Sequence, residues 1–188
     1  MILSRHHCMV YDGNRTTHLR PIARMIKQKL AENHRCLYLN SESMIEAIRP
    51  YLAAAGVDVP SQLLAKNLVL SADRHLVEGR FDVEAMIAGL EAAFETAMRD
   101  GYAGLWATGD MTWELGQDWD VEKLIRYEWR LEKLIRAHPE IGGVCQYNVA
   151  TLPRGLVEKG VEMHPAVFVN ETLTKLNSTF TPMGDVFD

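Results

Sequence analysis

The sequence predicts a three-layer α/β/α sandwich built on a mostly parallel sheet of about six or more strands. Short apolar runs rich in β-branched residues alternate about six times with segments whose apolar residues recur at helical spacing. This alternation is typical of a parallel sheet with helices on both faces. The strand-like runs are also apolar on both of their faces, as expected of strands that are covered on two sides.

The predicted strands are all short. They cover residues 7–11, 35–39, 68–70, 105–108, 144–147 and 166–169. The clearest helix runs from Asp82 to Arg99, with Asp82 as its N-cap and Gly101 as its stop signal. Four further helices are predicted over residues 20–33, 43–55, 118–137 and 153–163. We start the first of them at 20 because Pro21 is best tolerated in the first turn of a helix.

Length and composition predict a single globular domain over residues 1–188, with a peripheral tail at 177–188. The chain has 188 residues, of which 47% are hydrophobic and 24% charged. These values exclude disorder, collagen-like repeats and a disulfide-stapled mini-protein. The tail is turn-rich, and it leaves room for a homodimer.

The net charge and the cysteines indicate which kinds of partner and which cellular compartment to expect. A formal net charge of -5 disfavours direct binding to nucleic acid, which needs basic groups to neutralise phosphates. No run of apolar residues is long enough to cross a membrane, and the N-terminus lacks a secretory signal. Three cysteines without a CxxC pair are typical of free thiols. We therefore expect a cytoplasmic protein with no membrane partner.

The carboxyl ends of the predicted strands are all polar, and in parallel sheets ligands bind beyond these ends. The segments concerned are 11–14, 40–42, 71–74, 108–110, 146–148 and 170–171. Loops are commonly polar for other reasons, but the concentration of Asp, Asn, Gln and Tyr favours a small-molecule pocket along this edge. The first of these loops contains neither GxxxxGK[ST] nor GxGxxG, which disfavours ordinary nucleotide hydrolysis.

Three positions allow both a structural and a functional interpretation. Asp110 either orients a polar ligand or caps the following turn. Trp113 either fills the core or forms a wall of a ligand site. Glu128 falls within the apolar stripe of its helix, where a buried carboxylate needs partners; it forms either a structural salt bridge, for instance to an arginine, or part of a pocket.

The first strand carries a weaker signal for metal binding. His6 and Cys8 share one face of this strand, Tyr11 takes the other, and Cys145 on another strand could add a ligand. Such scattered ligands fall short of a zinc signature. The ordinary interpretation is a packed thiol beside a hydrogen-bonded histidine, so we predict no metal, no cofactor and no catalytic residue.

Seven short motifs occur in an order that resembles the MEDS domain, a sensory domain named for methanogens, methylotrophs and a dichloromethane-responsive transcription regulator. The resemblance covers about residues 5 to 180. The motifs are His6-x-Cys8-x-x-Tyr11, Cys36-Leu-Tyr-Leu, Ala54-Ala-Gly-Val-Asp58, Gly79-Arg-Phe-Asp82, Thr108-Gly-Asp-Met-Thr-Trp113, Tyr127-Glu128 and Cys145-Gln-Tyr147. Two departures are the segment 12–18, where the family has acidic residues, and Gly109-Asp110 in place of Gly-Glu.

The resemblance implies a RecA/KaiC-like fold without the phosphate loop. It also implies that the domain detects simple hydrocarbon derivatives. Family members are often fused to helix-turn-helix or histidine-kinase modules. We therefore expect a stand-alone bacterial sensor that binds a small organic molecule and signals to a histidine kinase or a transcription regulator. The predicted ligand-binding residues are His6, Tyr11, Asp73, Asp110, Trp113, Glu128, Gln146 and Tyr147. Two alternatives are a protein-interaction scaffold and an enzyme that uses a nucleotide or employs Asp110 or Glu128 as a base.

Overall fold

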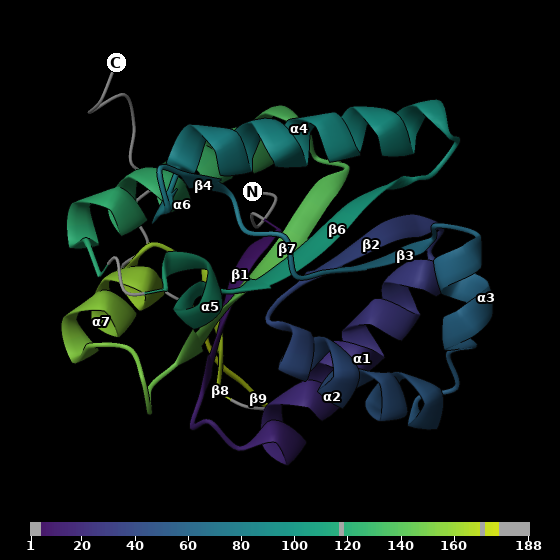
Figure 1. Ribbon diagram of the computed structural model, residues 1–188, viewed down its shortest axis with the longest axis horizontal. Helices are drawn as coiled ribbons and strands as arrows, with labels where there is room; N and C mark the ends of the chain where they lie inside the picture. The colour runs from purple at the N-terminus through teal and green to yellow at the C-terminus, as the bar shows by residue number, and fades with distance from the viewer. Residues whose placement is uncertain (1–4, 117–118, 170–171, 177–188) are drawn as a thin grey trace.

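The computed structural model describes residues 5–116, 119–169 and 172–176, and it shows the predicted α/β sandwich (Figure 1). One sheet has the strand order β3-β2-β6-β7-β1-β8-β9, in which the first six strands are parallel and β9 runs antiparallel to β8. Its strands are β1 (His6–Tyr11), β2 (His34–Leu39), β3 (Leu68–Ser71), β6 (Gly104–Asp110), β7 (Ile141–Asn148), β8 (Ala166–Val169) and β9 (Thr172–Leu176).

Helices cover both faces of the sheet, as Figure 1 shows. One layer contains α1 (Arg15–Ala31), α2 (Glu42–Ala54) and α3 (Val59–Leu64). The other contains α4 (Val83–Arg99), the short α5 (Met111–Leu115), α6 (Val121–Ala137) and α7 (Arg154–Glu162). Each layer encloses its own apolar core against the sheet, because strands buried on both sides contribute side chains to two cores.

The long helices begin and end where their capping residues lie. The Asp82 side chain accepts a hydrogen bond from the Ala85 amide at the start of α4, and Gly101 follows its end with a φ of 85°. Both features were predicted. Helix α6 starts at Val121 rather than 118, because Asp120 caps it by accepting from the amides of Glu122 and Lys123.

The predicted start of α1 was wrong. The helix begins at Arg15, five residues before the expected start, and Pro21 lies inside it. A proline in a helix interior removes one backbone hydrogen bond. Packing outweighs this loss, since Leu19, Ile22 and Ile26 are fully buried against the sheet.

Sequence patterns also missed several short elements. These are α3, α5, strand β9 and a two-stranded hairpin of β4 (Leu76–Val77) and β5 (Arg80–Phe81). Each is too short to show a period of its own. The predicted tail at 177–188 lies outside the described residues. Among the described residues, no helix is both long and apolar enough to cross a membrane.

Candidate functional site

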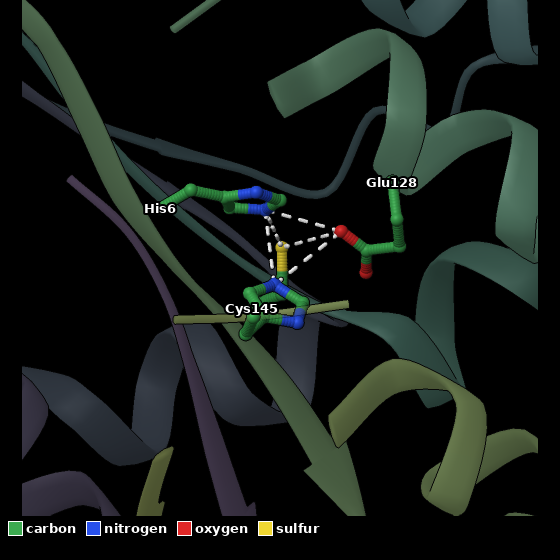
Figure 2. Close-up of side chains that lie close together, drawn as sticks. His6, Glu128 and Cys145 are labelled. Atoms are coloured by element: carbon green, nitrogen blue, oxygen red, sulfur yellow. Dashed lines mark hydrogen bonds and ion pairs between the residues drawn. The ribbon is translucent and has the colours of Figure 1, made fainter. Parts of the chain in front are cut away.

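Four ionisable or metal-ligating side chains meet between the sheet and the helices α6 and α7. We call them the buried cluster. They are His6, Glu128, Cys145 and His164. All are at most 5% exposed. One ligand atom from each lies within 4.8 Å of the others. Figure 2 shows His6, Glu128 and Cys145 pointing toward one another.

The cluster is assembled from four separate parts of the chain. His6 begins β1, Cys145 lies in the middle of β7, and β1 and β7 are parallel neighbours. Glu128 comes from the inner face of α6, and His164 lies in the turn that leads into β8. Strand alternation places His6 and Cys8 on the same face, as predicted, toward α6 and α7.

The distances within the cluster are those of direct polar contacts. His6 Nε2 lies 3.1 Å from Glu128 Oε2 and 3.5 Å from Cys145 Sγ. It also lies 3.0 Å from His164 Nε2. Glu128 Oε2 is 3.4 Å from His164 Nε2 and 3.7 Å from Cys145 Sγ.

Neighbouring groups contact the atoms of the cluster residues that point away from the other cluster members. His6 Nδ1 lies 3.2 Å from Glu132 Oε2, and the other Glu132 oxygen accepts from Arg136 Nε at 2.6 Å. His164 Nδ1 lies 2.6 Å from the Gly160 carbonyl oxygen. The Tyr147 hydroxyl donates to Glu128 Oε1. The orientation of three of the four cluster side chains is therefore fixed from outside.

Burial and close contact shift the pKa of each member. Burial lowers the pKa of His6, but its contacts with Cys145, Glu128 and Glu132 together raise it well above its usual value. Burial raises the pKa of Glu128, but the two histidines and the Tyr147 hydroxyl together lower it. Burial and the nearby His6 lower the pKa of His164 to about 4. Burial and Glu128 raise the pKa of Cys145 to about 11.

Gly160 is the point at which α7 touches this arrangement. A Cβ atom at this position would lie 2.4 Å from Cζ of Tyr147, closer than atoms can pack. We expect Gly160→Ala to lower the free energy of unfolding by about 1–3 kcal/mol, because the Tyr147 ring must move inside a packed core. Urea denaturation followed by circular dichroism measures this loss.

Gly155 provides the matched control on the same helix. It is exposed, and a Cβ atom there would meet nothing within 4 Å. Because Ala is a better helix former than Gly, Gly155→Ala should stabilise the protein by about 0.5–1 kcal/mol. Equal effects of the two substitutions would show that the contact between Gly160 and Tyr147 is unimportant.

A second polar group lies at the carboxyl ends of β1, β6 and β7, where the sequence predicted a pocket. The Tyr11 hydroxyl donates to Asp110 Oδ2 at 2.5 Å, and the Tyr11 ring stacks on His18 with centroids 3.9 Å apart. His18 Nε2 lies 2.9 Å from Gln146 Oε1. The Gln146 amide in turn donates to the Thr108 hydroxyl at 2.7 Å.

Most polar atoms of this second group form hydrogen bonds with other members of the group. Burial, with the adjacent Asp110 carboxylate, raises the pKa of Tyr11. Burial lowers the pKa of His18, which favours the neutral ring. Within the described part of the chain, His18 Nδ1 is buried and has no hydrogen-bond partner. Asp110 also caps α5 by accepting from the amides of Thr112 and Trp113, so the capping role considered for it is present.

A small apolar cavity adjoins the buried cluster. It has a volume of about 30 Å³ and lies between the sheet and the helices α4 and α6. Its walls include Ala107, Leu90, Leu131 and Ile135, with His6 and Cys145 at one side. This volume is enough for about two water molecules or a ligand of very few atoms.

The structure divides the eight residues predicted to bind a ligand among several places. His6, Glu128 and Tyr147 come together around the buried cluster, whereas Tyr11, Asp110 and Gln146 form the second group. Asp73 lies in an exposed loop, where it accepts from the Ser71 hydroxyl. Trp113 is half-buried and packs against the α4–α6 core, which matches the core-filling interpretation. Among the described residues, the partners of Glu128 are His6, His164, Tyr147 and Cys145, and none is an arginine.

Sequence reasoning gave no role to His164, His18 or Glu132. His164 is separated from His6 by 158 positions, so no local spacing connects the two. Glu132 did carry a signal, because it lies one helical turn after Glu128 and therefore shares its face of α6. His18 lies in the helix segment that was predicted to begin only at residue 20.

Comparison with known proteins identifies one family. The family model described as "MEDS: MEthanogen/methylotroph, DcmR Sensory domain" matches residues 5–165. The matched region includes all four members of the buried cluster and the whole second group. No curated protein matches the chain.

Proposed function

Because this chain belongs to the MEDS family of sensory domains, we propose that it is a cytoplasmic sensor which binds a small organic molecule and passes the signal to a partner protein. The family implies a sensory role in general. The ligand that fits best is an apolar or weakly polar molecule of one or two carbon atoms. The partner that fits the family is a histidine kinase or a transcription regulator.

The cavity beside the buried cluster carries the proposal. Its walls are mainly aliphatic, and they also include the two cluster residues His6 and Cys145. An apolar pocket with a few convergent polar groups is typical of small-molecule sites. The volume of about 30 Å³ favours the smallest ligands, and it excludes a nucleotide.

Helix α6 provides a route from this cavity to the protein surface. Its inner face places Glu128 in the cluster and Leu131 on the cavity wall. Its outer face lines a surface groove with Arg126, Trp129 and Arg130. A ligand that favours one position of α6 would therefore change the surface available to a partner, since binding shifts an equilibrium through differential affinity.

Thermal unfolding in the presence of one- and two-carbon alcohols and haloalkanes tests ligand binding. At about ten times its Kd, a ligand that binds only the folded state adds about 1.4 kcal/mol of stability, which raises Tm by about 3–6 °C. We expect Ala107→Val to abolish this rise, because Ala107 lines the cavity and two added methyl groups would fill it.

Ala103→Val is the matched control, because the same change is made at an exposed residue just before β6. It should respond to the ligand like the unaltered chain. If no compound of this class raises Tm, or if Ala107→Val responds as fully as Ala103→Val, the cavity is not the ligand site.

A further inference from the structure

We propose that the buried cluster is a binding site for a divalent transition metal ion, best suited to zinc, with His6 Nε2, His164 Nε2, Cys145 Sγ and Glu128 Oε2 as its ligands. Imidazole, thiolate and carboxylate are the three kinds of side chain that bind zinc in proteins. Four of them from four separate parts of the chain converge here in the interior.

The spacing of the four atoms fits a tetrahedral site. Zinc binds nitrogen, oxygen and sulfur at about 2.0–2.3 Å, so the corners of a tetrahedron around it lie about 3.3–3.8 Å apart. Five of the six distances between these atoms range from 3.0 Å between the two histidine nitrogens to 3.7 Å between Glu128 and Cys145, and all six are within 4.8 Å. An ion at the centre would therefore need shifts of a few tenths of an ångström for these five pairs, and of at most about 1 Å between Cys145 and His164.

The hydrogen bonds on the outer side determine which nitrogen of each ring faces the cluster as a lone pair. The Gly160 carbonyl oxygen can only accept, so His164 Nδ1 carries the proton and the neutral ring turns its Nε2 lone pair inward. Glu132 has the same effect on His6 Nδ1. When His6 is neutral, two inward lone pairs, a carboxylate oxygen and a sulfur share one small space, which favours a metal cation among them.

The outer partners also match the way in which metal ligands are held. Histidine ligands typically donate their other N–H to a carboxylate or a backbone carbonyl, and carboxylate ligands are hydrogen-bonded in turn. Glu132, the Gly160 carbonyl and the Tyr147 hydroxyl supply these contacts. Glu132 is thus a positioning residue, itself held by Arg136.

The competing explanation is an ion pair without metal, in which a protonated His6 faces the Glu128 carboxylate. Titration of the unaltered chain with Co²⁺ after treatment with a chelator distinguishes the two explanations, because Co²⁺ substitutes for zinc and is visible by absorption. We expect one cobalt per chain, the strong visible absorption of a tetrahedral site and a thiolate-to-cobalt band in the near ultraviolet. Binding of no cobalt, or of cobalt without the thiolate band, would overturn the assignment in favour of the ion pair.

Cys145→Ser and Cys8→Ser form a matched pair, because these buried cysteines face each other in register on β7 and β1. Only Cys145→Ser should lose the thiolate band. Glu132→Gln should weaken zinc binding about 10- to 100-fold while keeping the tetrahedral spectrum. If Cys145→Ser keeps the band, or if Cys8→Ser loses it instead, Cys145 is not the ligand and the proposed set is wrong.

X-ray absorption at the zinc edge tests the site in the unaltered chain, so this test does not depend on the folding of a variant. We expect one sulfur at about 2.3 Å and three nitrogen or oxygen neighbours at about 2.0–2.2 Å. A shell without sulfur would contradict the site. Zinc binding and ligand binding are separable, since a chain that binds no zinc can still show the Tm response of the cavity, and the reverse also holds.

Discussion

Replacing Glu128 with Ala is expected to lower the free energy of unfolding by about 3–5 kcal/mol, because removal of one partner from a buried charged pair leaves the other uncompensated. Glu128 is 1% exposed and contacts His6, His164 and Tyr147. Its loss would leave the Tyr147 hydroxyl without its acceptor and would remove the only carboxylate from the buried cluster. Chemical denaturation at constant pH, with and without added zinc, measures the effect.

Two further variants show whether the buried contacts cause this loss. Glu122→Ala removes an exposed glutamate from the same helix and should change stability by no more than about 0.5 kcal/mol. Glu128→Gln keeps an acceptor for Tyr147 and should be less destabilising than Ala. A loss below about 1 kcal/mol for Glu128→Ala would mean that the cluster contributes little to stability.

Replacing Asp110 with Ala is expected to cost about 2–4 kcal/mol, because two separate contributions are lost. Asp110 caps α5, and the loss of an N-cap costs about 0.5–2 kcal/mol. It also accepts from the buried Tyr11 hydroxyl, and a buried donor without a partner costs about 1–3 kcal/mol. Measuring the effect of Asp110→Ala on the free energy of unfolding in the Tyr11→Phe variant separates the two contributions. In that variant the Tyr11 hydroxyl is absent, so only the capping contribution is lost.

Asp120→Ala is the control for the capping contribution alone. Asp120 caps α6 through the amides of Glu122 and Lys123, but it is exposed. Its loss should cost about 1 kcal/mol. If Asp110→Ala were no more destabilising than Asp120→Ala, the hydrogen bond from Tyr11 would contribute nothing measurable.

The sequence predicted the sheet and the long helices because their signals are local. Helix α4 shows this well, since an apolar stripe, a capping Asp82 and a following Gly101 all lie within one stretch of chain. The start of α1 was wrong for a physical reason, because burial of Leu19 and Ile22 stabilises a helix around Pro21 that local preference alone disfavours.

The candidate site was predictable only in part. Glu128 gave a signal, because a carboxylate within an apolar stripe needs a buried partner. The identity of that partner depends on contacts between residues far apart in the chain, such as His6 with His164. A turn histidine before a strand has no local property that marks it as buried, so His164 could be found only from the fold.

The same limit explains where the pocket was expected. Polar strand ends predicted a pocket along the carboxyl edge, and Tyr11, Asp110 and Gln146 do lie there. Their side chains bond mainly to one another and to His18 and Thr108, whereas the cavity lies beside His6 and Cys145 under α6. Residue types mark polar positions, but only packing determines where space remains.

The most direct test of the proposed sensor is a crystal structure of the full chain exposed to bromomethane, whose bromine atom scatters X-rays anomalously. The account predicts an anomalous peak in the cavity bounded by Ala107 and Leu131, beside Cys145. It also predicts a displacement of α6 relative to crystals without the compound. Bromine found only at the carboxyl edge of the sheet or on the surface, with the cavity unchanged, would contradict it.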